Sequence, residues 1–165
     1  MTGVQTCALP ISDGGLGGGG VDTMVVMEQI GKGLVLEPYL GCVVLPAALI
    51  KAAGTEAQRA SLSEGLASGE TLYAFAHTEP GQRYERASVA LTATQNADGY
   101  VLSGKKISVL GGDCADVLIV SAKVPGDSEA SLVLVPANAA GTFADTISTS
   151  AQSPPSTEIF LPLNT

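Results

Sequence analysis

Several residue types are scarce in this chain, and each scarcity excludes a class of function. Trp is absent, aromatic side chains make up 4% of the 165 residues, charged ones make up 15%, and His77 is the only histidine. No Ser-His-Asp or Cys-His pattern surrounds His77, so a hydrolase is not predicted. The carboxylates do not cluster at the spacing of metal ligands, so no metal site is predicted either. Taken alone, His77 is interpreted as a strand residue with local hydrogen bonds.

Basic residues are also few, since 8 Lys and Arg stand against 16 Asp and Glu and give a net charge of −8. They form no cluster, which argues against nucleic-acid binding, because neutralising phosphates needs grouped cations. No apolar run reaches the roughly 18 residues of a membrane span. Cys7, Cys42 and Cys114 are odd in number and far apart. They predict neither a disulfide framework nor a zinc site, and they fit a reducing cytoplasm.

The first residues, MTGVQTCALPIS, differ in character from the rest of the chain. They lack the basic start and sustained apolar stretch of a signal peptide. Back-translated, they resemble a sequencing adapter, so residues 1–12 are expected to be an artefactual leader and the natural N-terminus to be missing. The glycine-rich run at 14–20 follows no apolar strand, as a phosphate-binding loop would require, and is interpreted as a flexible loop.

Residues 13–70 are expected to form part of a helical domain. A helix over 21–37 carries apolar residues on most sides and should be buried. A second helix is predicted over 39–53. Thr55 and Gln58 have the spacing of a capping box, in which each side chain bonds the other's backbone N–H, so a third helix should begin there.

Residues 71–165 change to short apolar runs separated by turn residues, which is typical of strands. The runs VLIV (117–120) and LVLV (132–135) lack polar alternation and should be buried on both faces. The sequence therefore predicts an α+β protein whose second part is a small barrel or sandwich. The predicted strands are 71–77, 88–95, 99–103, 106–110, 116–124, 131–136, 142–148 and 157–163.

Four segments in order carry a resemblance to a known family. They are GTEAQRASLSEGLASGE (54–70), a Thr-Glu-Pro-Gly corner (78–81), DGYVLSGKK (98–106) and ADVLIVSAK (115–123). Together they resemble the acyl-CoA dehydrogenase family, in which a helix precedes a β-barrel middle domain. The readings EPGQRY (79–84) and VLG (109–111) are most similar to the small subunit of pimeloyl-CoA dehydrogenases.

The resemblance implies FAD as the cofactor and places its ring beside the strand that ends at Thr78. In the family the strand backbone and the threonine hydroxyl bond the pyrimidine side of the flavin. Fixed donors there stabilise the negative charge that follows hydride transfer. The chain departs from the family after Lys106, where the usual Trp becomes Ser108 and the usual hydroxyl residue becomes Leu110. The implied cofactor-binding residues are Phe75, Ala76, His77, Thr78, Ser108 and Leu110.

The corner departs from the family at Arg83 and Tyr84, which stand where a Gly and a Ser usually meet the acyl-CoA substrate. Both are implied as substrate-binding residues. Three interpretations of Arg83 stay open: a partner for the distal carboxylate of a dicarboxyl-CoA, a partner for a CoA phosphate, or a solvated loop cation.

The resemblance implies that the intact protein oxidises an acyl-CoA to the 2-enoyl-CoA in β-oxidation, delivers electrons to a transfer protein, and forms a homo- or hetero-oligomer. No catalytic base is assigned, because the family takes it from a C-terminal helical domain expected beyond Thr165. Two rivals remain: a non-catalytic small subunit of a heteromeric dehydrogenase, and a structural β-barrel that mediates interactions.

Overall fold

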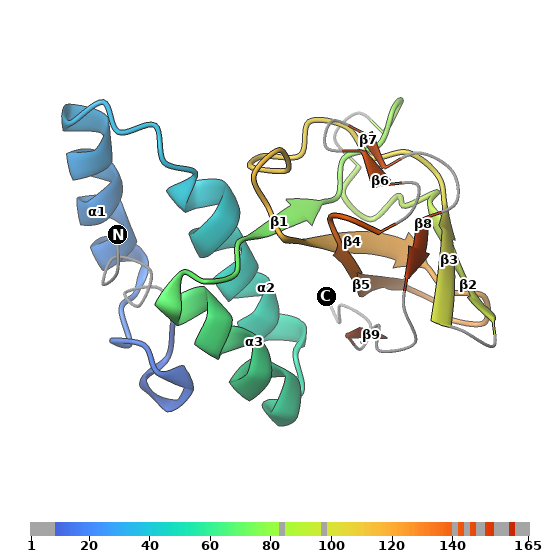
Figure 1. The fold of residues 1–165 in the computed structure, drawn as a ribbon, viewed down its shortest axis with the longest axis horizontal. Helices are drawn as coiled ribbons and strands as arrows, with labels where there is room; N and C mark the ends of the chain where they lie inside the picture. Colours follow the sequence, from blue (N-terminus) through green and yellow to red (C-terminus); the bar gives the residue numbers. More distant parts are fainter. Residues whose placement is uncertain are drawn as a thin grey trace.

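The computed structural model describes residues 9–82, 85–96 and 99–139, and four short strands beyond them. Helices gather at one end and a sheet at the other, and strand β1 leads from the first to the second (Figure 1). The predicted α+β class is therefore confirmed. The four short strands are β6 (Thr142–Phe143), β7 (Thr146–Ile147), β8 (Ala151–Ser153) and β9 (Ile159–Phe160).

From residue 9 onward, the helical end contains three α-helices and two short turns. Thr55 caps the third α-helix as predicted: Gln58 N donates to Thr55 Oγ1 at 3.3 Å, and Thr55 N donates to Gln58 Oε1 at 3.0 Å. The elements are the 3-10 turn η2 (Ile11–Asp13), α1 (Gly20–Lys32), the π-helical turn η3 (Leu40–Val44), α2 (Leu45–Ala53) and α3 (Glu56–Ser68).

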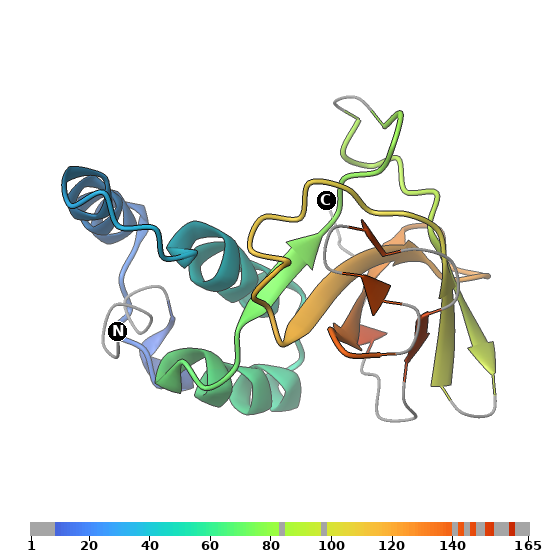
Figure 2. The same ribbon diagram turned by 45° about the horizontal axis from the view of Figure 1, so that its top comes forward.

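The expectation that the first long helix is buried is wrong. None of the residues of α1 is buried, and Val21 is 70% and Met24 62% exposed. Figures 1 and 2 show the reason, because α2 and α3 lie next to the sheet while α1 stands at the outer end of the molecule. Its apolar residues do not gather on one side facing the sheet, so periodicity alone overestimated its burial.

The sheet is mixed and has the strand order β8-β3-β2-β4-β5-β9, with β1 beside β4 in parallel. Its end strands, β8 and β9, are not paired with each other in the described part of the chain, so the predicted closed barrel is wrong. The longer strands are β1 (Tyr73–Ala76), β2 (Thr92–Asn96), β3 (Gly99–Ser103), β4 (Val117–Lys123) and β5 (Ala130–Pro136).

The predicted strand over 106–110 is also absent from the structure, which has a loop there. Ser108 takes a φ of 53°, in the left-handed region that a strand cannot contain. Lys106 is fully buried and Ile107 N donates to Thr78 O at 2.8 Å. These contacts bind the segment to the end of β1 and not to a strand ladder.

The sheet has a hydrophobic cluster on each face, as the continuous apolar runs predicted. Ile119 and Tyr73 face the helices, and Val120 and Ala74 lie in the cluster on the opposite face. All four are buried. The alternation follows from strand geometry, in which neighbouring side chains point to opposite faces. Strand β1 therefore contributes to both clusters.

Leu9 is 1% exposed and packs with Ala47, Ile50 and Leu66 on the helix side of the sheet. Residues 1–12 were not expected to belong to the fold, so the packing of Leu9 differs from the expectation. The adapter origin of residues 1–12 and the domain boundary near residue 70 both stay predictions.

Candidate functional site

The end of β1 forms the centre of the site, because exposed and buried polar groups alternate there. Thr78 is exposed, and its hydroxyl has no hydrogen-bond partner among the described residues. The next residue, Glu79, is only 7% exposed. The corner thus presents the Thr78 side chain outward while Glu79 anchors it from within.

Lys106 completes this anchor from the loop after β3. Its side chain is 0% exposed, and its Nζ atom donates to Glu79 Oε1 at 2.7 Å, Ser121 Oγ at 2.9 Å and His77 O at 3.1 Å. An ammonium group has three N–H donors, so these three acceptors satisfy it completely. Burial lowers the pKa of Lys106, and the hydrogen bond and negative charge of Glu79 oppose that shift.

Glu79 is equally well satisfied. Oε1 also accepts from Leu91 N at 2.9 Å, and Oε2 accepts from Ala90 N at 2.8 Å. Burial alone would raise the pKa of this carboxyl, but the bonds from Lys106, Leu91 and Ala90 outweigh burial and lower it. With both oxygens occupied, Glu79 is held as a structural carboxylate and is unsuited to act as a proton acceptor.

His77 belongs to the same polar network. Its Nδ1 lies 3.0 Å from Ser121 Oγ, and its Nε2 lies 3.5 Å from Gln82 Nε2. Gln82 Nε2 donates its two N–H groups to Ser88 O at 2.7 Å and to Glu85 O at 3.2 Å, so it ties the following loop beside the ring. Burial, followed by the positive charge of Lys106, lowers the pKa of His77, which favours the neutral ring. Gln82 also accepts from Glu79 N at 2.9 Å and so closes the corner.

The predicted cofactor residues of β1 fall on its two faces. The rings of Phe75 and His77 stack, with centroids 5.3 Å apart and planes at 16°. Ala76 points to the opposite face and is completely buried, so its side chain cannot meet a ligand. The bond from Val117 N to Leu72 O shows that backbone groups of alternate residues face β4. Those of Phe75 therefore face the other edge of β1.

The predicted residues of the second loop lie beside the end of β1. The bond from Ile107 N to Thr78 O joins the two segments, and Ser108 and Leu110 are both exposed, Leu110 by 53%. Ser108 is held at positive φ, a conformation that costs a non-glycine residue on the order of 1 kcal/mol or more. Strained positions of this kind cluster at functional sites, which supports a role for this loop.

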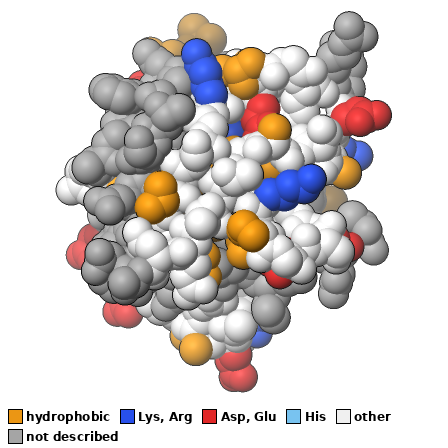
Figure 3. Space-filling view, turned by 90° about the vertical axis from the view of Figure 1, so that its right-hand side faces the viewer, with side chains coloured by type: hydrophobic (Ala, Val, Ile, Leu, Met, Phe, Trp, Pro, Cys, Tyr) orange, Lys and Arg blue, Asp and Glu red, His pale blue; other side chains and the backbone are white. Residues whose placement is uncertain are grey.

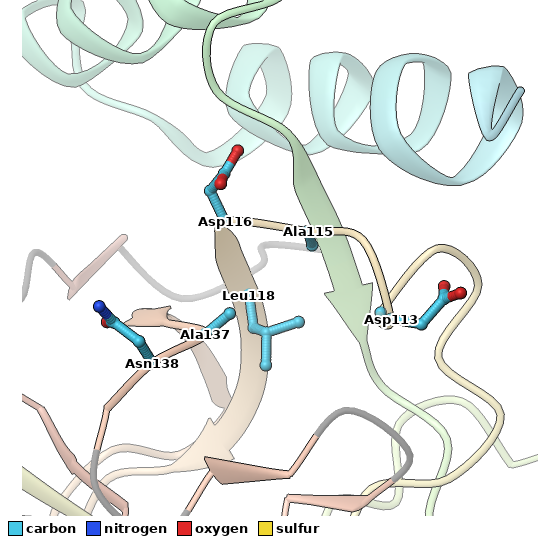
Figure 4. A pocket seen from close by; sticks show the side chains of 7 residues that line it. Asp113, Ala115, Asp116, Leu118, Ala137 and Asn138 are labelled. Atoms are coloured by element: carbon cyan, nitrogen blue, oxygen red, sulfur yellow. The ribbon is translucent and has the colours of Figure 1, made fainter.

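A hollow of about 460 Å³ lies elsewhere, beside the start of β4 (Figure 4). Asp113 and Asp116 are among the residues that line it, and Asp116 Oδ2 accepts from Leu72 N at 2.8 Å. Two negative charges disfavour a phosphate-bearing ligand there. The lining residues are Gly112, Asp113, Ala115, Asp116, Leu118, Ala137 and Asn138.

The sheet end of the molecule shows hydrophobic side chains only as separate spots among the atoms drawn in colour or white (Figure 3). This view therefore offers no broad apolar surface in the described part of the chain. The predicted substrate residues Arg83 and Tyr84 lie outside the described residues.

Sequence reasoning missed the Glu79–Lys106 pair, although both residues stand inside the motifs that it used. The available signal was a Glu directly before Pro80 and a Lys between a turn and an apolar segment, each at a position where the neighbours are expected to be buried. An apolar sheet with a polar strand end and an exposed hydroxyl defines a small-molecule binding domain. The polar groups at this strand end suit the polar edge of a ligand.

Comparison with known proteins identifies this class. Residues 74–161 match the middle domain of acyl-CoA dehydrogenases, and residues 2–70 match their N-terminal domain. The chain belongs to the acyl-CoA dehydrogenase family. The match to the middle domain alone covers more than half of the 165 residues.

Relatives support the assignment. Mitochondrial isovaleryl-CoA dehydrogenase of Bos taurus is 36% identical over 73% of this chain and 29% of its own length. Butyryl-CoA dehydrogenase of Megasphaera elsdenii is 28% identical, with a TM-score of 0.69 over 84% of this chain and 39% of that one. A chain of the ChsE4-ChsE5 complex of Mycobacterium tuberculosis is 29% identical, with a TM-score of 0.71 over 84% of this chain and 36% of that one. The chain thus spans well under half the length of these relatives.

Proposed function

We propose that the intact protein is an FAD-dependent acyl-CoA dehydrogenase that oxidises an acyl-CoA to the trans-2-enoyl-CoA. The observation that carries this proposal is the exposed hydroxyl of Thr78, which has no partner among the described residues, at a corner fixed by the buried Glu79–Lys106 pair. The names of the relatives agree, since isovaleryl-CoA and butyryl-CoA dehydrogenase are both acyl-CoA dehydrogenases.

The residues present fit a flavin. A flavin ring is planar and carries donors and acceptors along its pyrimidine edge. In the described part of the chain, the edge of β1 away from β4 offers the backbone N–H and C=O of Phe75, and the exposed Thr78 follows directly after the strand. The carbonyl of His77 is already occupied by Lys106 Nζ, so it is not counted among the available groups.

When bound, the flavin accepts the hydride from the β-carbon of the acyl chain. The residues of this chain orient and stabilise it. Thr78 and the Phe75 backbone hold the polar edge, and fixed donors at that edge favour a reduced, negatively charged ring. Lys106 keeps the corner in place without touching a ligand and is therefore a positioning residue. The loop at Ser108 and Leu110 covers the side of the site next to Thr78.

For the substrate, we propose a dicarboxyl-CoA such as pimeloyl-CoA, because Arg83 stands in the corner that meets the acyl-CoA in the family. A guanidinium pairs with a terminal carboxylate through two parallel hydrogen bonds. Tyr84 is proposed as a second contact to the same substrate.

The partners are proposed as an electron-transfer protein and further dehydrogenase subunits, in a cytoplasmic setting. The ChsE4-ChsE5 complex shows that one structural relative assembles from two different chains. The exposed Val21, Met24, Leu34 and Leu36 leave apolar surface on the helical end, which suits an oligomer. No described helix is long and apolar enough to cross a membrane.

One observation favours a second candidate, a non-catalytic subunit of a heteromeric dehydrogenase. Leu110 supplies no hydroxyl beside the flavin site and is 53% exposed. A subunit that no longer turns over substrate would tolerate that loss.

Titration of the purified protein with FAD separates the candidates. An intact dehydrogenase should bind FAD with saturation, quench flavin fluorescence and bleach the visible flavin absorbance when acyl-CoA is added. Binding without bleaching supports the non-catalytic subunit. Absence of saturable binding would remove the flavin assignment altogether.

A further inference from the structure

Two cysteines that are distant in the sequence meet behind the loop of the candidate site. Cys42 in η3 and Cys114 before β4 are 72 positions apart, and their Sγ atoms lie 3.9 Å from each other. Both thiols are free. Each also points to the same carbonyl, Gly111 O, at 3.7 Å from Cys42 and 3.3 Å from Cys114.

The backbone between them is shaped for this approach. Gly111 has a φ of +76°, and the bond from Cys114 N to Gly111 O closes the turn that carries Cys114 toward η3. A Cβ atom on Gly111 would lie 2.5 Å from Cys42 Sγ, so any other residue would displace the sulfur. The glycine therefore permits both the turn and the sulfur contact.

The two thiols differ in access. Cys114 is exposed, whereas Cys42 is 1% exposed. Burial, followed by the nearby Cys114, raises the pKa of Cys42 to about 12. An oxidant from solution therefore meets Cys114 first, and Cys42 reacts only with a group that Cys114 brings to it.

We propose that Cys42 and Cys114 form a reversible intramolecular disulfide by exchange with a low-molecular-weight disulfide such as oxidised glutathione. The sulfurs need to close from 3.9 Å to the bond length of about 2.05 Å. Rotation about the side-chain bonds and a small movement of the exposed Gly111–Cys114 turn supply this displacement.

The exchange balances in two steps. The Cys114 thiolate attacks one sulfur of the external disulfide, which forms a mixed disulfide and releases one thiolate. The Cys42 thiol then loses its proton and attacks the Cys114 sulfur of the mixed disulfide, which expels the second external thiolate. The two protein thiols are oxidised, and two electrons and two protons end on two molecules of the external thiol.

The bond would lock the loop of the candidate site to the helical end. A Cβ atom on Gly41 would lie 2.6 Å from Leu110 O, so η3 and this loop already approach backbone to backbone. A link from Cys42 to Cys114 would fix that approach from the other side of Gly111. The oxidation state of the pair thus controls how freely Leu110 and its neighbours move.

The test uses the full chain with Cys7→Ser, so that Cys42 and Cys114 are the remaining thiols. The protein is equilibrated under native conditions with glutathione buffers of increasing oxidised fraction and then trapped with acid and a maleimide. Peptide mapping without reductant should give one peptide pair joined through Cys42 and Cys114. Both thiols should disappear together, and dithiothreitol should restore them.

Matched variants identify the order of the steps. Cys42→Ser, or Cys42→Ala if the first is unstable, should stop at a Cys114–glutathione adduct. Cys114→Ser should leave Cys42 unmodified. Oxidation should raise the urea midpoint of the Cys7→Ser protein and leave that of Cys114→Ser unchanged. A glutathione adduct without the joined peptide in Cys7→Ser, cross-linked dimers, or modification of Cys42 in Cys114→Ser would each overturn the proposal.

Discussion

Lys106 Nζ lies 2.7 Å from Glu79 Oε1, in an ion pair from which solvent is almost excluded. The two residues are 27 positions apart and belong to different loops. Together with the bond from Ile107 N to Thr78 O, the pair joins the end of β1 to the loop that carries Ser108. The buried Glu79–Lys106 pair therefore holds the exposed part of the candidate site in place.

Replacing Lys106 with Met should destabilise the protein strongly. The change leaves the Glu79 carboxylate buried without its counter-ion, and breaking such a pair typically costs about 3–5 kcal/mol. Urea unfolding followed by circular dichroism measures the loss. Lys105→Met is the matched control, since Lys105 is exposed and its replacement should change the free energy of unfolding by less than about 0.5 kcal/mol. Equal midpoints for the two variants would show that the pair does not hold the corner.

The stability of the protein should fall as the pH is lowered below about 6.5, the ordinary pKa of histidine. His77 has a lowered pKa in the folded state, because it is buried and faces Lys106. Below pH 6.5, His77 binds a proton in the unfolded chain but remains neutral in the folded chain. Lowering the pH therefore favours unfolding. Titration of this one group can change the free energy of unfolding by at most about 1.4 kcal/mol per pH unit. Urea midpoints between pH 7.5 and 5.5 test this.

His77→Gln provides the control for that experiment, because glutamine does not titrate. Its midpoint should depend less on pH across the same window. The NMR signal of the ring, the only histidine in the chain, should titrate below the value of the denatured protein. A folded-state pKa at or above the denatured value would contradict the assignment of a neutral, buried ring.

Replacing Thr78 with Val should weaken FAD binding by about 1–2 kcal/mol, because the variant keeps the volume and removes one hydrogen-bonding hydroxyl. Fluorescence titration with FAD gives the dissociation constants. Thr94→Val serves as the control, since Thr94 is an exposed residue of β2 away from the corner. If both variants bind FAD as the parent does, Thr78 is not part of the site.

Replacing Arg83 with Met should reduce kcat/KM for a dicarboxyl-CoA by at least about tenfold in the intact enzyme. A charge-assisted pair contributes roughly 1.5–3 kcal/mol, and its loss affects only the substrate that uses it. The plain acyl-CoA of equal length is the internal control and should be oxidised at nearly the parent rate. Equal losses on both substrates would place Arg83 at the shared CoA portion, and no loss on either would remove the proposed substrate preference.

Features written in short stretches could be predicted from the sequence. The Thr55–Gln58 capping box and the burial of VLIV and LVLV both agree with the structure. In each case the relevant contacts join near neighbours or follow from an apolar run. The motif residues around Thr78 also carried the family assignment.

Features that depend on distant partners could not be predicted in the same way. The burial of Lys106 could not be predicted, because charged residues are seldom buried without a partner, and the partner lies in another loop. Cys42 and Cys114 gave no local pattern across 72 positions. The apolar residues Ile107, Val109 and Leu110 favoured a strand, but the left-handed conformation of Ser108 prevents one. The open edge of the sheet likewise depends on how strands far along the chain meet.

The parallel pairing of β1 with β4 bears on how the chain folds. Tyr73 is paired with Val117, so β1 has no neighbour in the sheet until the chain reaches β4. During synthesis, α2 and α3 can form as soon as they leave the ribosome, while the apolar surface that they share with Ile119 and Leu132 stays open. The entropy cost of closing a loop of this length must be met before the contacts between β1 and β4 can form. Folding should therefore be slow compared with that of a helical domain. The protein should therefore depend most on chaperones while its helical end has been synthesised and β4 has not.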